Sequence, residues 1–305
     1  MKRRISPWIP SLCPYLDCQA HTRGAPSGPI SRRLIRRGRY FRVEDSRWIS
    51  RFLCPRCRRS FSSSRFSPCF RQKKRRLNLS VRALLSSGCS QRRMARLLQI
   101  DRKTVVRKFL FIAQQAKRER LQSLEDLRRG DLITRVQFDE MESFEHSKCL
   151  PLSIPLVVEA GSRKILGFRV GRMPAKGLLA QISRKKYGPR KDDRPKMARD
   201  LFSELSSVID SKAHFTTDQN PKYPSWLRPH FPEITHRAVK GRRGCTVGQG
   251  ELKRIGFDPL FSLNHTAAMI RANVNRLFRK RGAPPRSENG LRPILRSMCS
   301  IIIRY

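Results

Sequence analysis

The chain has 305 residues, of which 38% are hydrophobic and 30% charged, so it can form one large domain and one or two small ones. It contains 67 Lys and Arg against 23 Asp and Glu, and the resulting net charge of +44 favours a polyanionic partner. No apolar run reaches the roughly 20 residues of a membrane-spanning helix, and Pro7, Pro10 and Pro14 interrupt the basic start where a signal peptide would be apolar. We therefore expect a cytoplasmic, nucleoid-associated protein that binds nucleic acid and no membrane.

Residues 1–70 contain two cysteine pairs, Cys13 with Cys18 and Cys54 with Cys57, which are separated by 35 residues. Four thiolates from two short knuckles suit tetrahedral Zn²⁺, and a structural zinc holds together a segment with too little core to fold alone. We predict a zinc ribbon here, in which His21 is an alternative ligand to one of the first pair. The other possibility is a set of unpaired cysteines in a disordered arm.

Residues 71–128 begin with a basic linker and then show the pattern of a helix-turn-helix. Ser90 is positioned to cap one short helix and Asp101 a second one after a tight turn, which continues as a polar helix to Arg128. A recognition helix in the major groove of DNA needs polar side chains facing outward near its start. The predicted DNA contacts are Arg102, Lys103, Thr104 and Arg107, and the predicted inward residues are Val105, Val106, Phe109 and Leu110. A plain helical hairpin is the alternative.

Residues 129–280 have the order of elements of an α/β (α+β) domain. Three strands are predicted at 136–141, 152–159 and 164–170, followed by a basic loop through Lys185 and Lys191. A helix is predicted at 197–209, and further strands at 214–217 and 234–239. Three antiparallel strands, a helix, two more strands and a final helix form the mixed sheet with flanking helices of a ribonuclease-H-like fold.

Two aspartates end strands in this order, Asp139 on the first strand and Asp218 on the fourth. These strands are neighbours in a ribonuclease-H-like sheet, so the two carboxylates are expected to meet at one end of it. Carboxylate oxygens are ligands that Mg²⁺ prefers, and a metal pair there promotes displacement at a phosphodiester. The structural alternative for Asp218 is an Asx-turn in Asp218-Gln219-Asn220-Pro221.

The chain resembles the DDE-type bacterial insertion-sequence transposases that carry an amino-terminal zinc ribbon and helix-turn-helix. The matching pieces are Cys54-Pro55-Arg56-Cys57, the segment Ser90–Lys108, Phe138-Asp139-Glu140, Thr217-Asp218 and a predicted helix from Asn264 to Lys280. The resemblance implies Mg²⁺- or Mn²⁺-dependent strand cleavage and strand transfer on double-stranded DNA, at element ends and target, by a homodimer or larger assembly.

The third member of the implied triad departs from the usual glutamate. Asn264 lies seven residues before Arg271, which occupies the basic position of the family, so the resemblance implies Asn264 as metal ligand and Arg271 as an active-site cation. An amide oxygen can bind Mg²⁺ but adds no charge. Glu251 is the alternative third acid, although Gly256 and Pro259 separate it from this helix.

After Lys280, Arg281-Gly282-Ala283-Pro284-Pro285-Arg286 ends the helical pattern abruptly. We interpret residues 281–305 as a frameshifted or disordered tail of a truncated copy. Codons that encode Arg281-Gly282-Ala283-Pro284-Pro285-Arg286, when read one base earlier, can encode Thr-Trp-Cys-Thr-Thr-Lys, the kind of segment expected here in a transposase of this type. Two alternatives to a transposase remain: a non-enzymatic zinc and helix-turn-helix DNA-binding regulator, and a nonspecific nucleic-acid-binding protein.

Overall fold

The computed structural model describes residues 9–21, 34–240, 252–253, 256–274 and 277. The chain divides into two compact units, Met1–Ser80 and Val81–Tyr305, and each is described by itself. Within the described residues, no helix is long and apolar enough to cross a membrane. The predicted tail and the alternative acid Glu251 lie outside the described residues.

The first unit contains an antiparallel sheet of three strands, β1 (Ile35–Arg42), β2 (Arg47–Leu53) and β3 (Ser60–Ser62). Its small core consists of Phe52, Phe61 and Leu34 together with three of the cysteines. So few apolar side chains give little hydrophobic stabilisation, which is why a domain of this size usually needs a metal or disulfides. Short 3₁₀ helices, η1 (Gln19–His21), η3 (Val43–Asp45) and η4 (Ser63–Phe66), connect its parts.

Three helices follow, α1 (Leu77–Ser86), α2 (Gln91–Leu97) and α3 (Arg102–Arg129). The predicted caps are present: the Ser90 hydroxyl accepts a hydrogen bond from the backbone N–H of Arg93, and the Asp101 carboxylate accepts one from that of Lys103. Gln99 takes a positive φ of 50° in the turn between α2 and α3. The helices share a core of Val81, Met94, Val105 and Ile112.

Leu110, predicted to face inward, is 49% exposed because it lies on the outer side of α3.

Helix α3 runs without a break for 28 residues, and its second half joins the core of the sheet that follows. Leu124 packs among the buried residues beside β4 (Ile133–Phe144). The guanidinium of Arg120 donates two hydrogen bonds to the carboxylate of Glu204, at 2.7 and 3.1 Å. The amino-terminal half of α3 therefore belongs to the helical core and its carboxy-terminal half to the sheet.

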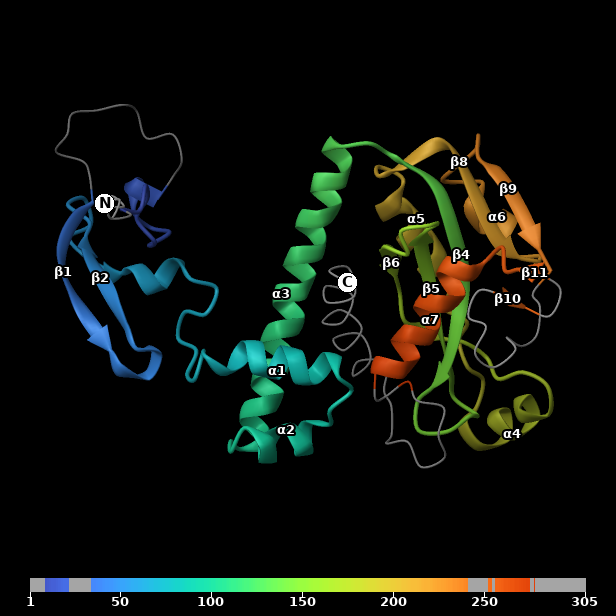
Figure 1. Cartoon of the computed structure of the whole chain (residues 1–305), viewed down its shortest axis with the longest axis horizontal. Coiled ribbons are helices and arrows are strands. Elements are labelled where there is room, and N and C mark those ends of the chain that lie inside the picture. The colour runs from blue at the N-terminus through green and yellow to red at the C-terminus, as the bar shows by residue number, and fades with distance from the viewer. Residues whose placement is uncertain (1–8, 22–33, 241–251, 254–255, 275–276, 278–305) are drawn as a thin grey trace. The chain divides into compact units, whose positions relative to one another are not determined.

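The large sheet has the strand order β6-β5-β4-β8-β9 (Figure 1). Strand β5 (Pro151–Glu159) is antiparallel to both β4 and β6 (Ile165–Phe168), whereas β8 (Ile209–Asp218) pairs parallel with β4, and β9 (Thr235–Val239) pairs parallel with β8. A short strand, β7 (Gly171–Arg172), also pairs with β5. This mixed sheet, with three consecutive antiparallel strands and the fourth beside the first, confirms the predicted α/β, ribonuclease-H-like class.

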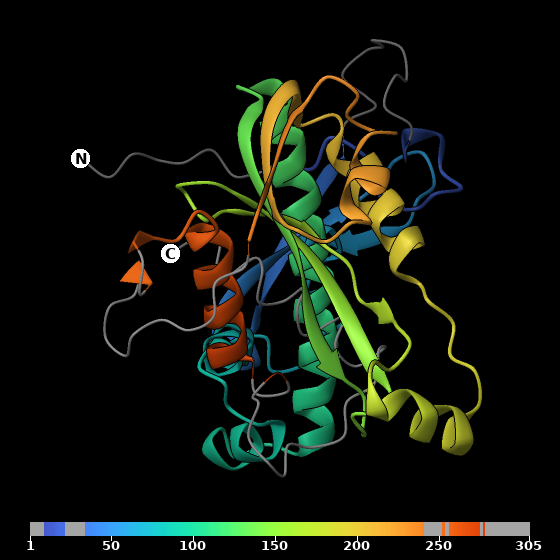
Figure 2. The ribbon, with the colours of Figure 1, turned by 90° about the vertical axis from the view of Figure 1, so that its right-hand side faces the viewer.

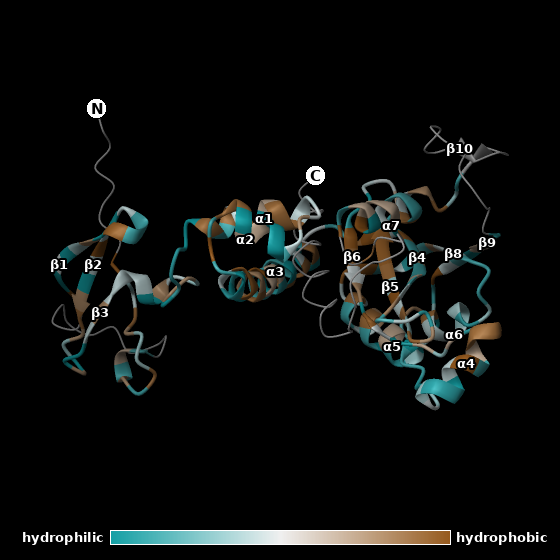
Figure 3. Cartoon of the chain, turned by 90° about the horizontal axis from the view of Figure 1, so that it is seen from below, coloured by the Kyte–Doolittle hydropathy of each residue, from teal (hydrophilic) through white to brown (hydrophobic). Residues whose placement is uncertain are grey.

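Helices cover both faces of the sheet (Figure 2). On one face, α5 (Arg194–Leu205) buries Leu201, Phe202 and Leu205 against Phe138 and Phe215. On the other, α7 (Phe261–Asn273) buries Leu263 and Ile270 against Met141 and Leu156. Because both faces are covered, β5 is apolar along most of its length instead of alternating, as its colour in Figure 3 shows.

Several predicted boundaries are wrong. The segment after β7 that was predicted as a basic loop contains a helix, α4 (Leu178–Tyr187). The prediction failed because the lysines of this segment were given more weight than its apolar residues Leu178, Leu179 and Ile182. Ile209 opens β8 instead of ending the preceding helix. The predicted helix 264–280 is described from Phe261 to Asn273, and Val274 is extended. Among the described residues, the elements that were not predicted include α6 (Tyr223–Leu227), β10 (Leu252–Lys253) and β11 (Gly256–Phe257).

The ion pair between α3 and α5 gives a test of how the long helix is held. Burial raises the pKa of Glu204, but hydrogen bonds and charges from Arg120 and Arg169 outweigh burial and lower that pKa to about 2. A lowered carboxyl pKa stabilises the fold at pH values above the unfolded pKa and is lost as pH falls toward 2. We predict that Glu204→Gln lowers the free energy of unfolding by roughly 1–3 kcal/mol at pH 7, measured by urea denaturation.

The same measurement at low pH provides the control. The difference between Glu204→Gln and the wild type should shrink as the pH is lowered from about 4.5 toward 2. Exposed Glu233→Gln should change stability by less than about 0.5 kcal/mol at either pH. An equal effect of both substitutions would show that the Arg120–Glu204–Arg169 cluster does not fasten α3.

Candidate functional site

Asp139 and Asp218 lie side by side where the parallel pairing of β4 with β8 ends. Asp218 is the last residue of β8, but β4 continues past Asp139 to Phe144, so the expectation that Asp139 ends its strand is wrong. Phe138 of β4 is paired with Thr217 of β8 in the register, so the next residue on each strand is an aspartate. Both carboxylates are half-buried. The sheet therefore brings together the two acids that the sequence singled out.

The surroundings of Asp139 disfavour its charged form. Burial and the charge of Asp218 raise the pKa of Asp139 to about 6, although hydrogen bonds from the backbone N–H of Glu140 and from Tyr223 partly oppose this. Two carboxylates held together in a partly dry site repel each other unless a cation neutralises them. The donor set thus fits a divalent metal bound through oxygen.

Tyr223 is a site residue that the sequence did not reveal. Its hydroxyl donates a hydrogen bond to Oδ1 of Asp139 at 2.9 Å, and its ring is buried against Phe138. Burial, followed by the charge of Asp139, raises the pKa of Tyr223 far above its usual range, so the phenol stays protonated and remains a donor. A Tyr in Pro221-Lys222-Tyr223-Pro224 carries no motif, and only the unpredicted helix α6 explains its position.

Asp218 also makes the turn that was its structural alternative. Its Oδ1 accepts a hydrogen bond from the backbone N–H of Asn220 at 3.1 Å, as in an Asx-turn. This bond occupies one oxygen and orients the carboxylate at the end of β8. The turn and a ligand role are compatible, because the second oxygen takes no part in it.

The start of α7 is fastened to β4 through Gln137, which lies two residues before Asp139 and on the same face of the sheet. The buried Gln137 side chain donates to the carbonyl of Pro259 at 2.9 Å and accepts from the backbone N–H of Leu263 at 2.8 Å. The residue after Leu263 is Asn264. The amide contacts therefore fix the first turn of α7 on the face of the sheet that carries Asp139.

Asn264 is exposed in the first turn of α7, and its Nδ2 donates a hydrogen bond to Oδ2 of Asp258 at 2.8 Å. Asp258 is buried, and its Oδ1 accepts from the backbone N–H of Leu260. With the amide nitrogen held in this way, Oδ1 of Asn264 is the atom that remains as a cation ligand. Arg271 follows two turns later on the same side of α7.

Within the described part of the chain, no third Asp, Glu, His or Cys joins the two aspartates in a metal-binding group. The other carboxylates of β4 have different partners. Glu140 accepts a hydrogen bond from the hydroxyl of Ser153, Glu142 pairs with Lys176, and Glu145 pairs with Arg190. These three acids are therefore salt-bridge and hydrogen-bond partners of neighbouring side chains.

The predicted DNA contacts lie at the start of α3. Arg102, Lys103 and Arg107 are exposed, and Thr104 is partly exposed. Val105 and Phe109, which are four residues apart and so lie on one face of the helix, are buried. The first two turns of α3 therefore present a basic polar face to solvent.

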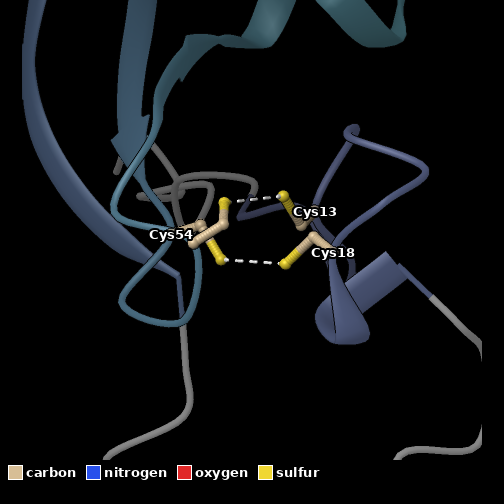
Figure 4. A group of neighbouring side chains, drawn as sticks. Cys13, Cys18 and Cys54 are labelled. Atoms are coloured by element: carbon tan, nitrogen blue, oxygen red, sulfur yellow. Dashed lines mark hydrogen bonds between the residues drawn. The ribbon is translucent and has the colours of Figure 1, made fainter.

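A second candidate site lies in the first unit, where the four predicted zinc ligands meet. The Sγ atoms of Cys13, Cys18, Cys54 and Cys57 all lie within 4.8 Å of one another. Cys13 and Cys57 are 3.8 Å apart, and so are Cys18 and Cys54, which joins the two knuckles (Figure 4). Four sulfurs about 2.3 Å from a tetrahedral zinc lie about 3.8 Å apart, so the group fits this ion.

The pKa values of two of these thiols, Cys13 and Cys57, are shifted in opposite directions. Burial raises the pKa of Cys13 to about 12, which makes its thiolate costly without a metal. Burial acts in the same direction on Cys57, but hydrogen bonds from Arg59 outweigh it and lower that pKa to about 6. His21 is not part of the group, because its Nδ1 lies 2.7 Å from the carbonyl oxygen of Cys13.

No known sequence family matches the chain, and no curated protein matches it. Solved structures that share part of its chain path include a crystal structure of the Mos1 mariner paired end complex with Mn, with 11% identity and a TM-score of 0.22 over 53% of this chain and 59% of that one. Another is a crystal structure of the Mos1 strand transfer complex, with 11% identity and a TM-score of 0.25 over 74% and 77%. This chain spans about three fifths of the first structure's chain. Likeness at this level adds nothing to the fold class, which depends on the strand order.

The cysteine group predicts that the purified protein carries one equivalent of zinc. Cys54→Ser should lose the metal and expose the first unit to proteolysis, because Phe52 and Phe61 cannot hold it together alone. Cys69→Ser, in the same unit but outside the group, should retain the zinc. Elemental analysis and limited trypsin digestion measure both effects, and full zinc content in Cys54→Ser would exclude the site.

The paired aspartates predict that Asp139 destabilises the metal-free protein. The folded pKa of about 6 lies above the usual aspartate pKa of 3.8, so the folded state binds more protons across this window and stability falls as pH rises through it. At pH 7 without divalent metal, Asp139→Asn should raise the free energy of unfolding by roughly 1–3 kcal/mol. Chemical denaturation measures this.

The matched control is Asp131→Asn, an exposed aspartate just before β4. It should leave stability unchanged within about 0.5 kcal/mol. Added Mg²⁺ should stabilise the wild type and leave Asp139→Asn unaffected, because the ligand is removed. A lower free energy of unfolding in metal-free Asp139→Asn would mean that the Asp139 carboxylate stabilises the fold, which would contradict the prediction.

Proposed function

We propose that the protein is a transposase that cleaves and rejoins DNA strands with a divalent metal at Asp139 and Asp218. The observation that carries the proposal is the register of β4 and β8, which sets two acids side by side where the parallel pairing ends. Burial and the charge of Asp218 raise the pKa of Asp139. Structural roles seldom require adjacent carboxylates that repel each other. Perturbed acids of this kind are typical of functional sites.

The proposed metal is Mg²⁺, or Mn²⁺, with Asp139, Asp218 and Asn264 as ligands. When bound, it supplies positive charge that activates a water or 3′-hydroxyl oxygen and stabilises the leaving oxygen of a phosphodiester. The neutral amide of Asn264 gives weaker binding than a carboxylate would, and Glu251 is the alternative third ligand. Arg271, two turns after Asn264, is the proposed cation for the phosphate.

Other residues of the site position these groups. Tyr223 holds Asp139 through one oxygen and keeps the other free, because a phenol donates a single hydrogen bond. Gln137 ties the first turn of α7 to β4 through two buried hydrogen bonds, which holds Asn264 on the face of the sheet that carries Asp139. Such fixed ligands lower the reorganisation needed at the transition state.

The exposed start of α3 is proposed to read the element ends. Arg102, Lys103, Thr104 and Arg107 are the candidate contacts to bases and phosphates in the major groove. The cysteine group is proposed to bind a structural zinc that keeps the first unit folded for DNA binding. Joining two ends requires two active sites, so a homodimer or larger assembly on DNA is part of the proposal.

One experiment separates binding from cleavage. The DNA flanking the gene supplies candidate terminal repeats, and a labelled duplex with such an end is incubated with the protein and Mg²⁺. We predict that the wild type nicks the strand at the end, that Asp139→Asn and Asp218→Asn reduce the rate at least a hundredfold, and that both still bind in a gel-shift assay. Arg107→Ala should bind more weakly, by roughly five- to a hundredfold.

The controls address the alternatives. Asp131→Asn and exposed Lys212→Ala should cleave and bind as the wild type does. Sequence-specific binding with no cleavage by the wild type at any metal concentration would favour the DNA-binding regulator. Binding that falls steeply with salt and does not distinguish the terminal sequence from other DNA would favour the nonspecific nucleic-acid-binding protein.

A further inference from the structure

The first strand of the first unit is exposed along nearly its whole length. Seven of the eight residues of β1 are exposed and the last is intermediate, although three of them are large apolar or aromatic side chains. Ile35 is 49% exposed, Tyr40 38% and Phe41 47%. A strand that served only to cover the small core of this unit would bury every second side chain.

An aromatic cluster forms where β1 meets β2. Phe41 is paired with Trp48 in the register, and their rings meet edge to face at 5.4 Å. The guanidinium of Arg39 lies over the Trp48 ring, 4.6 Å from its centre. Trp48 nevertheless remains 58% exposed. We call Arg39, Phe41 and Trp48 the hairpin cluster.

The charge around the hairpin cluster is positive. The β1–β2 hairpin contains six arginines and two acids, Glu44 and Asp45. Asp45 is already paired with Arg42, Arg47 and Arg75. Among the described residues, no salt bridge links an acid to the four remaining arginines, which are Arg36, Arg37, Arg39 and Arg51.

We propose that the hairpin cluster binds unpaired bases of a nucleic-acid strand by stacking, while the neighbouring arginines contact its phosphates. A base of any sequence can stack on an exposed aromatic ring or on a guanidinium plane, and the other arginines of the hairpin supply positive charge for the phosphates of the same strand. Stacked pairs inside a duplex do not offer a free base face. The surface therefore selects strand ends, gaps or unwound DNA.

This inference goes beyond the proposed transposase function and is independent of the two aspartates. It assigns the first unit a direct nucleic-acid contact in addition to its proposed zinc. Cleavage by the sheet domain would create the frayed ends that such a surface binds. A nuclease site that fails in Asp139→Asn leaves the hairpin cluster untouched, so the two proposals fail separately.

The test compares two labelled 12-nucleotide single strands with identical phosphates, oligothymidylate and its fully abasic counterpart. Binding to the full-length, zinc-loaded protein is measured by fluorescence anisotropy without added Mg²⁺, at a salt concentration that gives micromolar affinity. The wild type should bind the strand with bases at least about five-fold more tightly, as one stacked base provides. Trp48→Ala and Phe41→Ala should abolish this preference.

Two further variants make the outcome specific. Val43→Ala, at a 78% exposed position on the same hairpin, should keep the preference for bases. Arg39→Ala should weaken binding of both strands, and unchanged circular dichroism melting should show that each variant is folded. The proposal is overturned if the wild type binds both strands equally, which would show contact through phosphates only. It is also overturned if Trp48→Ala retains the preference, which would place base stacking elsewhere in the protein.

Discussion

The parallel pairing of β4 with β8 is the constraint on which the candidate active site depends. Phe138 is paired with Thr217, so a shift of one residue in register would separate Asp139 from Asp218 and turn one of them to the opposite face. The register is held by two cores that lie on opposite faces, because Phe138 and Phe215 pack toward α5 while Met141 packs toward α7. Packing on both faces of the sheet therefore fixes the relative positions of Asp139 and Asp218.

The sequence predicted the elements whose side chains follow a clear period and missed those that depend on distant contacts. Asp139, Asp218 and the four cysteines come together as their spacing and strand order indicated. Tyr223 did not stand out, since its role arises only when α6 brings it back over β4. Gln137 and Asp258 were equally invisible, because a buried polar side chain has no pattern in a single sequence.

Boundaries failed where local composition and tertiary contacts disagree. The lysines of α4 suggest a loop, yet the helix forms with its charges in solvent. Ile209 continues the four-residue spacing of α5 but pairs with Ile133 in the sheet, where it gains backbone partners as well as burial. Leu110 fits an apolar helical face in the sequence, but the core reaches only Phe109 and Ile112.

The continuity of α3 has a consequence for the phase of its two ends. The helix turns by about 100° and rises 1.5 Å per residue, so the basic face at Arg102–Arg107 has a fixed angular offset from the Arg120 and Leu124 anchors. Inserting one residue between them would rotate the basic face by about 100°, whereas seven residues would nearly restore the angle and add about 10 Å. The helix therefore fixes both the distance and the angle between its two ends. Its length can change only in steps of about two turns without rotating the basic face away from its present direction.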